Sequence, residues 1–162
     1  MHTGREMDIR EAIRSSYLAR DFTDEQLESL YKIAVCRSFE DGEEILRQFD
    51  NTRDVLILAS GSANILTVVG EPIGMVTPGM PMGEISFIDS KSRSGTAVAN
   101  GHCEVVVLPA EPLMAILQAS PPMAVKALWN LSKVLCMRLR AANNNLAALM
   151  AIEESEVGVS KR

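Results

Sequence analysis

Residues 82–99 contain the side chains of this chain that are best suited to bind an anionic ligand. Gly83 has no Cβ, so a ligand can approach its backbone closely. The apolar spacing that follows predicts one short helical turn, whose free N–H groups favour a phosphate. Arg93, nine residues after Glu84, carries a fork of donors that suits phosphate oxygens. Glu84 repels a phosphate but accepts hydrogen bonds from hydroxyl groups, so the pair predicts a nucleotide held at both its sugar and its phosphate.

The order of residues across this segment is typical of one family. Gly83-Glu84-Ile85-Ser86 is followed by Arg93-Ser94 and then by the alternating strand Thr96-Ala97-Val98-Ala99. This order resembles the phosphate-binding cassette of cyclic nucleotide-binding domains, the sensor module of catabolite activator proteins and of cyclic-nucleotide-dependent kinases. The likeness extends from about Phe22 to about Met150, and therefore covers most of the chain.

The resemblance implies how the phosphate of such a ligand is held. Arg93 would pair with the cyclic phosphate, helped by the backbone N–H groups of Ile85, Ser86 and Ser94. We expect cyclic AMP rather than cyclic GMP as the ligand, although a hydroxyl group at Ser94 is compatible with both. No other cofactor is expected.

The sugar and the base have their own candidate residues. By resemblance, Glu84 would accept a hydrogen bond from the ribose 2′-hydroxyl, Gly83 would keep the backbone close, and Ile85 and Ile73 would line the purine side. In the catabolite activator group, a polar residue of the C-terminal helix reaches the base. By resemblance, Asn143 lies in the corresponding region of this chain. An asparagine both donates and accepts hydrogen bonds, so Asn143 is a candidate for reading the purine edge; a solvated or interface position on the helix is the alternative.

Composition limits the class of protein. A chain of 162 residues is long enough for one domain with a core. Its formal net charge of −5 argues against a nucleic-acid-binding surface, which needs clustered Lys and Arg. No apolar run reaches the roughly 18 residues that span a bilayer, and the charged N-terminus has no apolar core of a signal peptide. We therefore expect a cytoplasmic protein that binds neither nucleic acid nor membrane.

Histidines and cysteines give no support to an enzyme or a metal sensor. Cys36, Cys103 and Cys136 are far apart and form no C-x-x-C pair, and residues 1–35 lack the cysteine cluster of iron–sulfur sensors. His2 and His102 are too few for the metal site of a cupin. We expect no metal site and no catalytic activity, whereas a haem at His102 is an alternative that an absorbance spectrum would test.

The periodicity of the chain predicts an α+β fold. Amphipathic patterns predict helices at 6–20 and 23–33, the second with a Thr23-to-Gln26 capping box. About eight short strands separated by turns, including breaks at Gly61 and Gly101, follow up to Pro109. They predict an antiparallel β-roll or jelly roll (a double-stranded β-helix), flanked by the N-terminal helices and a long C-terminal helix. The expected segments are 1–34 (helical), 35–109 (β-roll with the cassette at 82–99), 110–152 (helical) and 153–162 (a polar tail).

The C-terminal helix, from about Met123 to Ile152, predicts self-association. An apolar stripe repeats along it in steps of three and four. At a rise of ~1.5 Å per residue the helix is roughly 40–45 Å long, more than a small barrel covers, so a second copy of the same helix is the simplest partner. The stripe consists of Leu128, Leu131, Leu135, Leu139, Ala142, Leu146 and Leu149.

Little sequence follows this helix, and none of it resembles a DNA-binding or catalytic domain. We therefore expect a homodimeric sensor that transmits ligand binding through its C-terminal helix to an unidentified effector protein. The alternative is a degenerate domain of the same fold that binds no nucleotide and serves only for dimerisation or docking.

Overall fold

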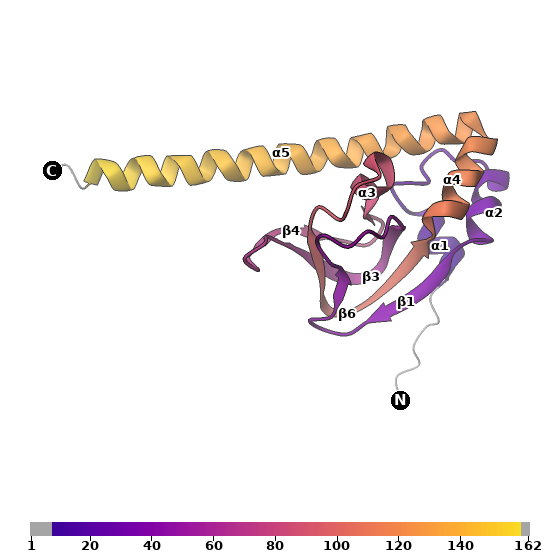
Figure 1. The fold of residues 1–162 in the computed structure, drawn as a ribbon, viewed down its shortest axis with the longest axis horizontal. Coiled ribbons are helices and arrows are strands. Elements are labelled where there is room, and N and C mark those ends of the chain that lie inside the picture. Colours follow the sequence, from indigo (N-terminus) through magenta and orange to yellow (C-terminus); the bar gives the residue numbers. More distant parts are fainter. Residues whose placement is uncertain (1–7, 160–162) are drawn as a thin grey trace.

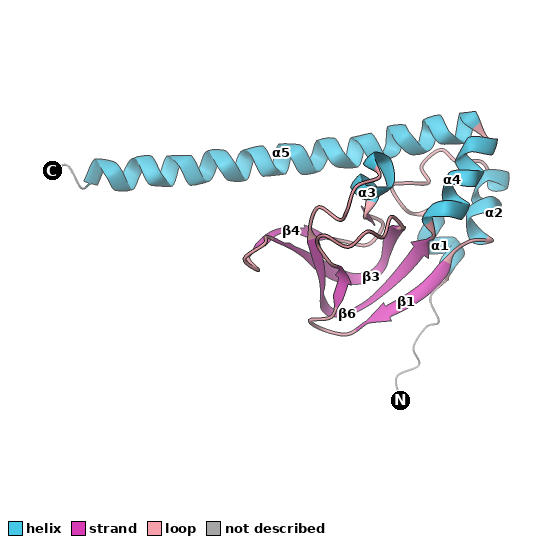
Figure 2. Cartoon of the chain, in the orientation of Figure 1, coloured by secondary structure: helices cyan, strands magenta, loops and turns pink. Residues whose placement is uncertain are grey.

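The computed structural model describes residues 8–159, and its centre is a six-stranded antiparallel sheet rolled on itself (Figures 1 and 2). His2 lies outside the described residues. The strands are ordered β1-β6-β3-β4, with β2 paired to β6 and β5 paired to β3. The strands are β1 (Val35–Phe39), β2 (Glu44–Leu46), β3 (Val55–Leu66), β4 (Pro72–Val76), β5 (Pro81–Met82) and β6 (Thr96–Leu108).

Helices cover one end of this roll (Figure 1). The helices are α1 (Ile9–Arg14), α2 (Asp24–Tyr31), α3 (Glu84–Asp89), α4 (Ala110–Ala119) and α5 (Pro121–Val159). The predicted capping box is present, since the Thr23 side chain accepts from the Gln26 N–H and the Gln26 side chain accepts from the Thr23 N–H. The predicted α+β fold, a β-roll flanked by N-terminal helices and a long C-terminal helix, is therefore confirmed.

The strands are fewer than the sequence indicated, because two of them are longer. The segments predicted as separate strands on either side of Gly61 form the single strand β3, and those around Gly101 form β6. Gly61 adopts a φ of +82°, and a Cβ there would lie 2.3 Å from the carbonyl oxygen of His102. The pairing of β3 with β6 shifts register between Leu58 and Ser62, so Gly61 marks an irregularity where β6 lies very close to β3, not the end of a strand.

Two helix boundaries also differ from the prediction. The N-terminal helix ends at Arg14, and turns replace the remainder of the segment predicted to be helical up to residue 20. At the other end, α5 continues to Val159, past the expected end at Ile152 and through most of the segment predicted as a polar tail.

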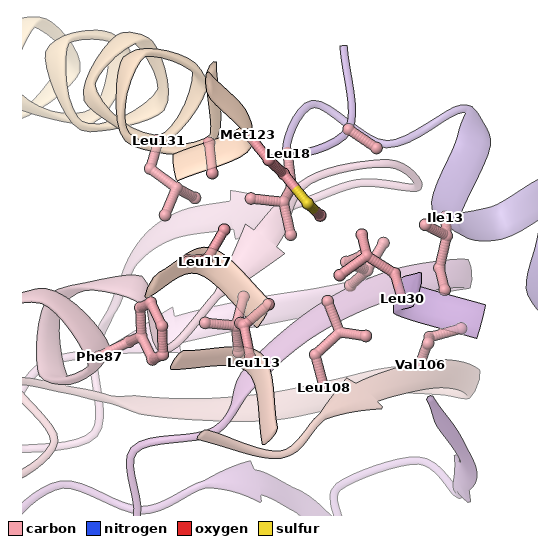
Figure 3. Packing of buried hydrophobic residues seen from close by; sticks show 14 of the residues in the cluster. Ile13, Leu18, Leu30, Phe87, Val106, Leu108, Leu113, Leu117, Met123 and Leu131 are labelled. Carbon is pink, nitrogen blue, oxygen red and sulfur yellow. The ribbon is translucent and has the colours of Figure 1, made fainter. Parts of the chain in front are cut away.

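Two apolar clusters form the core. One fills the roll itself, and the other joins the helices to the outside of the sheet. Figure 3 shows the second cluster, in which Met123 and Leu131 of α5 lie with Leu18, Leu30 and side chains of β6 and α4. Leu131 of the predicted stripe is thus buried in the core, whereas most of that stripe faces outward.

The buried face of α5 ends near Arg138. Its buried positions are Met123, Ala127, Asn130, Leu131 and Val134. Arg138 is half-buried, and residues 139–155 are exposed. The last part of α5 therefore projects beyond the sheet, as Figure 1 shows at the yellow end of the ribbon.

Candidate functional site

A cavity of about 120 Å³ opens between the roll, α3 and α5. Most of the cassette residues predicted from the sequence line it, together with apolar side chains from β2, β3, β5 and β6. The lining residues are Leu46, Ile65, Met82, Gly83, Glu84, Ile85, Ser86, Arg93, Ser94, Gly95, Thr96, Ala97 and Arg138.

Gly83 brings the two charged residues of the cassette together. It precedes α3 with a φ of +78°, in the left-handed region. A Cβ at this position would lie 2.4 Å from Nη1 of Arg93 and 2.7 Å from the carbonyl oxygen of Asp54. Glycine is therefore required both by its backbone conformation and by the close approach of the arginine.

Arg93 is a buried cation held by neutral oxygen atoms. Its side chain is 3% exposed, and it donates to Thr52 Oγ1 (3.1 Å) and to the carbonyl oxygens of Gly83 (2.8 Å) and Asp54 (2.8 Å). Burial lowers the pKa of the guanidinium, while Asp54, Glu84 and Asp50 act in the opposite direction. The hydroxyl group and the two carbonyl oxygens that accept from Arg93 are all uncharged. The cation therefore suits a bound anion in the cavity.

Glu84, the first residue of α3, is a buried carboxylate that is paired on one side only. It is 1% exposed, and its Oε1 forms an ion pair with Nη1 of Arg138. Its Oε2 is buried and has no hydrogen-bond partner. A buried acceptor without a donor is costly, so this oxygen is suited to a hydroxyl group of a ligand in the cavity.

The sequence analysis missed Arg138. This residue reaches the cavity from α5, and its Nη2 also donates to the carbonyl oxygen of Pro81 (2.5 Å). A buried carboxylate needs a cationic partner, and Arg138 follows the buried Val134 by one helical turn. The need of Glu84 for a cation and the spacing of Arg138 on the helix are the signals that could have indicated this pair. Their use depends on knowing which face of α5 meets the cassette, which the stripe alone did not reveal.

The structure does not bring all of the predicted residues to the cavity. Ile85, Ser86 and Ser94 line it. Ile73 lies on β4 and is 54% exposed, and Asn143 is exposed on α5 beyond Arg138; neither is a lining residue. The apolar lining comes instead from Leu46, Ile65, Met82 and Ala97. The roles of individual residues toward a ligand remain predictions.

Within residues 8–159, no three His, Cys, Asp or Glu side chains are grouped so that they could hold a metal ion. Among the same residues, none of the helices combines the length and the apolar character needed to span a membrane.

Comparison with known proteins assigns the family. The model of the cyclic nucleotide-binding domain matches residues 36–120, more than half of the chain. The chain belongs to the cyclic nucleotide-binding domain family. The resemblance seen in the cassette is thereby confirmed, and the β-roll is the fold of a cyclic nucleotide-binding regulatory domain.

Members of this family are found among both sequence relatives and solved structures. The chain is 31% identical over 123 residues to the cyclic AMP receptor protein of Thermus thermophilus, covering 74% of this chain and 55% of that protein. It is 25% identical over 147 residues to Glutaminase 2 of Bradyrhizobium diazoefficiens, covering 89% of this chain and 23% of that one. The crystal structure of a cyclic nucleotide-binding domain from Methylobacillus flagellatus superposes with a TM-score of 0.75 at 26% identity, covering 86% of this chain and 81% of that one. The chain thus spans about half of one sequence relative and about a quarter of the other.

Proposed function

We propose that this chain is a cyclic nucleotide sensor that binds cyclic AMP in preference to cyclic GMP and transmits binding through α5 to a partner protein. The observation that carries the proposal is the half-paired carboxylate of Glu84, buried in the same cavity as the guanidinium of Arg93. A cyclic nucleotide has one negative charge for the guanidinium and a free ribose hydroxyl for the carboxylate.

The phosphate is expected to lie between Arg93 and the first turn of α3. The N–H groups of Ile85 and Ser86 belong to this turn and have no carbonyl partner within the helix. Both residues line the cavity together with Ser94. These donors and the buried guanidinium would replace the water lost by a singly charged cyclic phosphate.

The preference for adenine is supported by the apolar part of the lining. The side chains of Leu46, Ile65 and Ala97 carry no hydrogen-bond acceptor and Met82 carries only a weak one, whereas the guanine base has three N–H donors and the adenine base two. Burying those donors without partners costs free energy, so cyclic GMP is expected to bind more weakly.

The position of Arg138 supports the proposed transmission through α5. This residue contacts both the carboxylate that would receive the ribose and the carbonyl oxygen of Pro81. A ligand that donates to Glu84 changes the electrostatics of that ion pair, and so favours one position of α5 over another in proportion to its differential affinity.

A second copy of the chain is the proposed partner of the exposed face of α5. One row of positions, in alternating steps of three and four, is exposed or half-buried along the helix and forms the a and d positions of a coiled coil. This seam consists of Val125, Leu128, Ser132, Leu135, Leu139, Ala142, Leu146 and Leu149. Arg138 and Asn143 flank it on opposite sides, so in a parallel pair Asn143 of a second copy approaches Arg138. In such a dimer, Asn143 would reach the cavity of the other copy, beside Arg138, and could there contact the base as predicted.

Isothermal titration of the purified chain with cyclic AMP, cyclic GMP and 5′-AMP tests the proposal. We expect cyclic AMP to bind most tightly and 5′-AMP, with its additional charge and no ring phosphate, to give no measurable heat. Arg93→Lys keeps the charge but loses the planar fork and should weaken cyclic AMP binding by at least tenfold, whereas Arg140→Ala, on an exposed position of α5, should not. If no cyclic nucleotide binds to protein free of co-purified ligand, the sensor is excluded and a docking module remains.

A further inference from the structure

The connection between β2 and β3, residues 47–54, forms hydrogen bonds with the segment that leads into β6, residues 93–96. Phe49 donates its N–H to the carbonyl oxygen of Arg93 (3.0 Å), and Arg93 donates its N–H to the carbonyl oxygen of Asp50 (2.8 Å). The guanidinium of Arg93 is held by Thr52 and Asp54 of the same connection. One segment therefore fixes both the main chain and the side chain of Arg93.

Gln48 extends this contact to the next residues of the cassette. Its N–H donates to Oγ1 of Thr96 (3.1 Å), and its side-chain Nε2 donates to the carbonyl oxygen of Ser94 (3.2 Å). These two hydrogen bonds are on either side of Gly95. A Cβ at Gly95 would have no neighbour closer than Cγ2 of Ile65 at 3.8 Å, and a glycine restricts its own backbone less than any other residue.

Ser94 and Gly95 line the cavity, whereas Gln48 does not. A glycine next to the phosphate site loses much conformational freedom when a ligand orders it. A loop that is already ordered before binding avoids that loss and binds more tightly. The hydrogen bond from the Gln48 side chain is therefore placed to order the loop in advance without touching the ligand.

We propose that Gln48 is a positioning residue for the phosphate site: its side chain holds Ser94 and Gly95 in the geometry that a cyclic phosphate requires. This inference rests on the proposed function, since it names a residue that serves the same site. Gln48 acts through the loop and makes no contact of its own with the ligand.

The binding test uses the full chain and cyclic AMP as the probe. Gln48→Ala removes the side-chain hydrogen bond and keeps the backbone one, and should weaken binding about 3- to 10-fold. Gln48→Glu replaces the donor with an oxygen that repels the Ser94 carbonyl, and should weaken binding at least as much. Gln118→Ala is the matched control, because Gln118 is exposed on α4, away from the cavity, and should bind as the wild type does.

A double-mutant cycle separates positioning from a general structural effect. Gly95→Ala restricts the loop by itself, and the added methyl group would have no protein atom closer than Cγ2 of Ile65 at 3.8 Å. If Gln48 acts by ordering the loop, Gln48→Ala should weaken binding less in the Gly95→Ala background than in the wild type. An equal loss in both backgrounds contradicts the inference.

A ligand-free measurement keeps the inference testable if binding fails. The ¹⁵N order parameters of Ser94 and Gly95 should fall in Gln48→Ala from the rigid range, about 0.85, toward the flexible range, below about 0.6. If the wild type does not bind cyclic AMP, the proposed function fails, and these order parameters still decide whether Gln48 orders the loop. If the wild type binds and Gln48→Ala matches it in affinity and in order parameters, the positioning role is wrong and the proposed function stands.

Discussion

At the scale of single residues, the site depends on how closely the backbone at Gly83 approaches the guanidinium of Arg93. The carbonyl oxygen of Gly83 accepts a hydrogen bond from Arg93 at 2.8 Å. The guanidinium also lies so close to the α-carbon of Gly83 that a methyl group there would collide with it. The burial of the cation and the left-handed backbone are therefore linked.

Gly83→Ala should both destabilise the fold and impair binding. The left-handed backbone costs about 1 kcal/mol for alanine, and moving Arg93 from its acceptors should raise the total loss in the free energy of unfolding to about 3 kcal/mol. The matched control is Gly42→Ala, at a φ of +81° with no atom within 4 Å of the added Cβ, which should show the backbone cost alone. Urea unfolding of both variants measures the difference, and equal losses would show that the contact with Arg93 is unimportant.

The residues of the cassette were predictable from the sequence because local order encodes them. Gly83, Glu84 and Arg93 lie within one short segment, and their types and spacing suffice to indicate sugar and phosphate binding. Arg138 and Gln48 could not be found in this way. Each meets the cassette from a distant part of the chain, and their contacts depend on which face of α5 packs inward and on how β2 joins β3.

At the scale of elements, α5 is joined to the N-terminal segment by a buried asparagine. Asn130 is 5% exposed, and its Nδ2 donates to the carbonyl oxygens of Leu18 and Arg20, both at 2.9 Å. The chain near Leu18 is in turn joined to the loop before β5, since Tyr17 donates its N–H to the carbonyl oxygen of Gly79 (2.9 Å). Beside its buried apolar face, α5 is therefore attached to the domain by polar contacts at Asn130 and at Arg138.

Asn130→Leu should keep the volume of the side chain and leave two carbonyl groups without their donor. We expect a loss of about 2 kcal/mol in the free energy of unfolding. Asn144→Leu, on the exposed part of α5, is the control and should change stability by no more than about 0.5 kcal/mol. Chemical denaturation compares the two, and a neutral Asn130→Leu would mean that water replaces the amide without cost.

The sequence identified most of the elements but not their lengths. The Thr23 capping box depends only on local sequence, and its prediction is confirmed. The sequence predicts strand ends at Gly61 and Gly101, because a glycine in an apolar strand has the same local signature whether the chain turns or a neighbouring strand lies very close. Which of these applies is decided by the partner strand, as the close approach of Gly61 to His102 shows.

At the scale of the whole molecule, the exposed seam of α5 predicts a dimer that point changes can dissociate. Leu139 is 62% exposed and Leu146 is 58% exposed in the single chain, and each occupies an a position of the seam. Leu139→Glu, or Leu146→Glu, places a charge where two copies meet. Light scattering should give twice 17.7 kDa for the wild type and the single-chain mass for these variants.

Met137→Glu is the control for this prediction. Met137 is also exposed on α5, but it lies on the side of the helix away from the seam, so the dimer should persist. A wild-type chain that remains monomeric at high micromolar concentration would contradict the dimer, and dissociation by Met137→Glu alone would place the contact on another face.

The spacing of the two contacts on α5 gives the helix the geometry of a lever. Asn130 and Arg138 are about 12 Å apart along the axis, whereas Asn130 and the end of the helix at Val159 are about 44 Å apart. With Asn130 as the fulcrum, a displacement of about 1 Å at Arg138 becomes about 3.6 Å at the far end, from the ratio of these two lengths. If a ligand moves α5 beside Glu84 as proposed, a partner attached to that end would experience a movement several times larger.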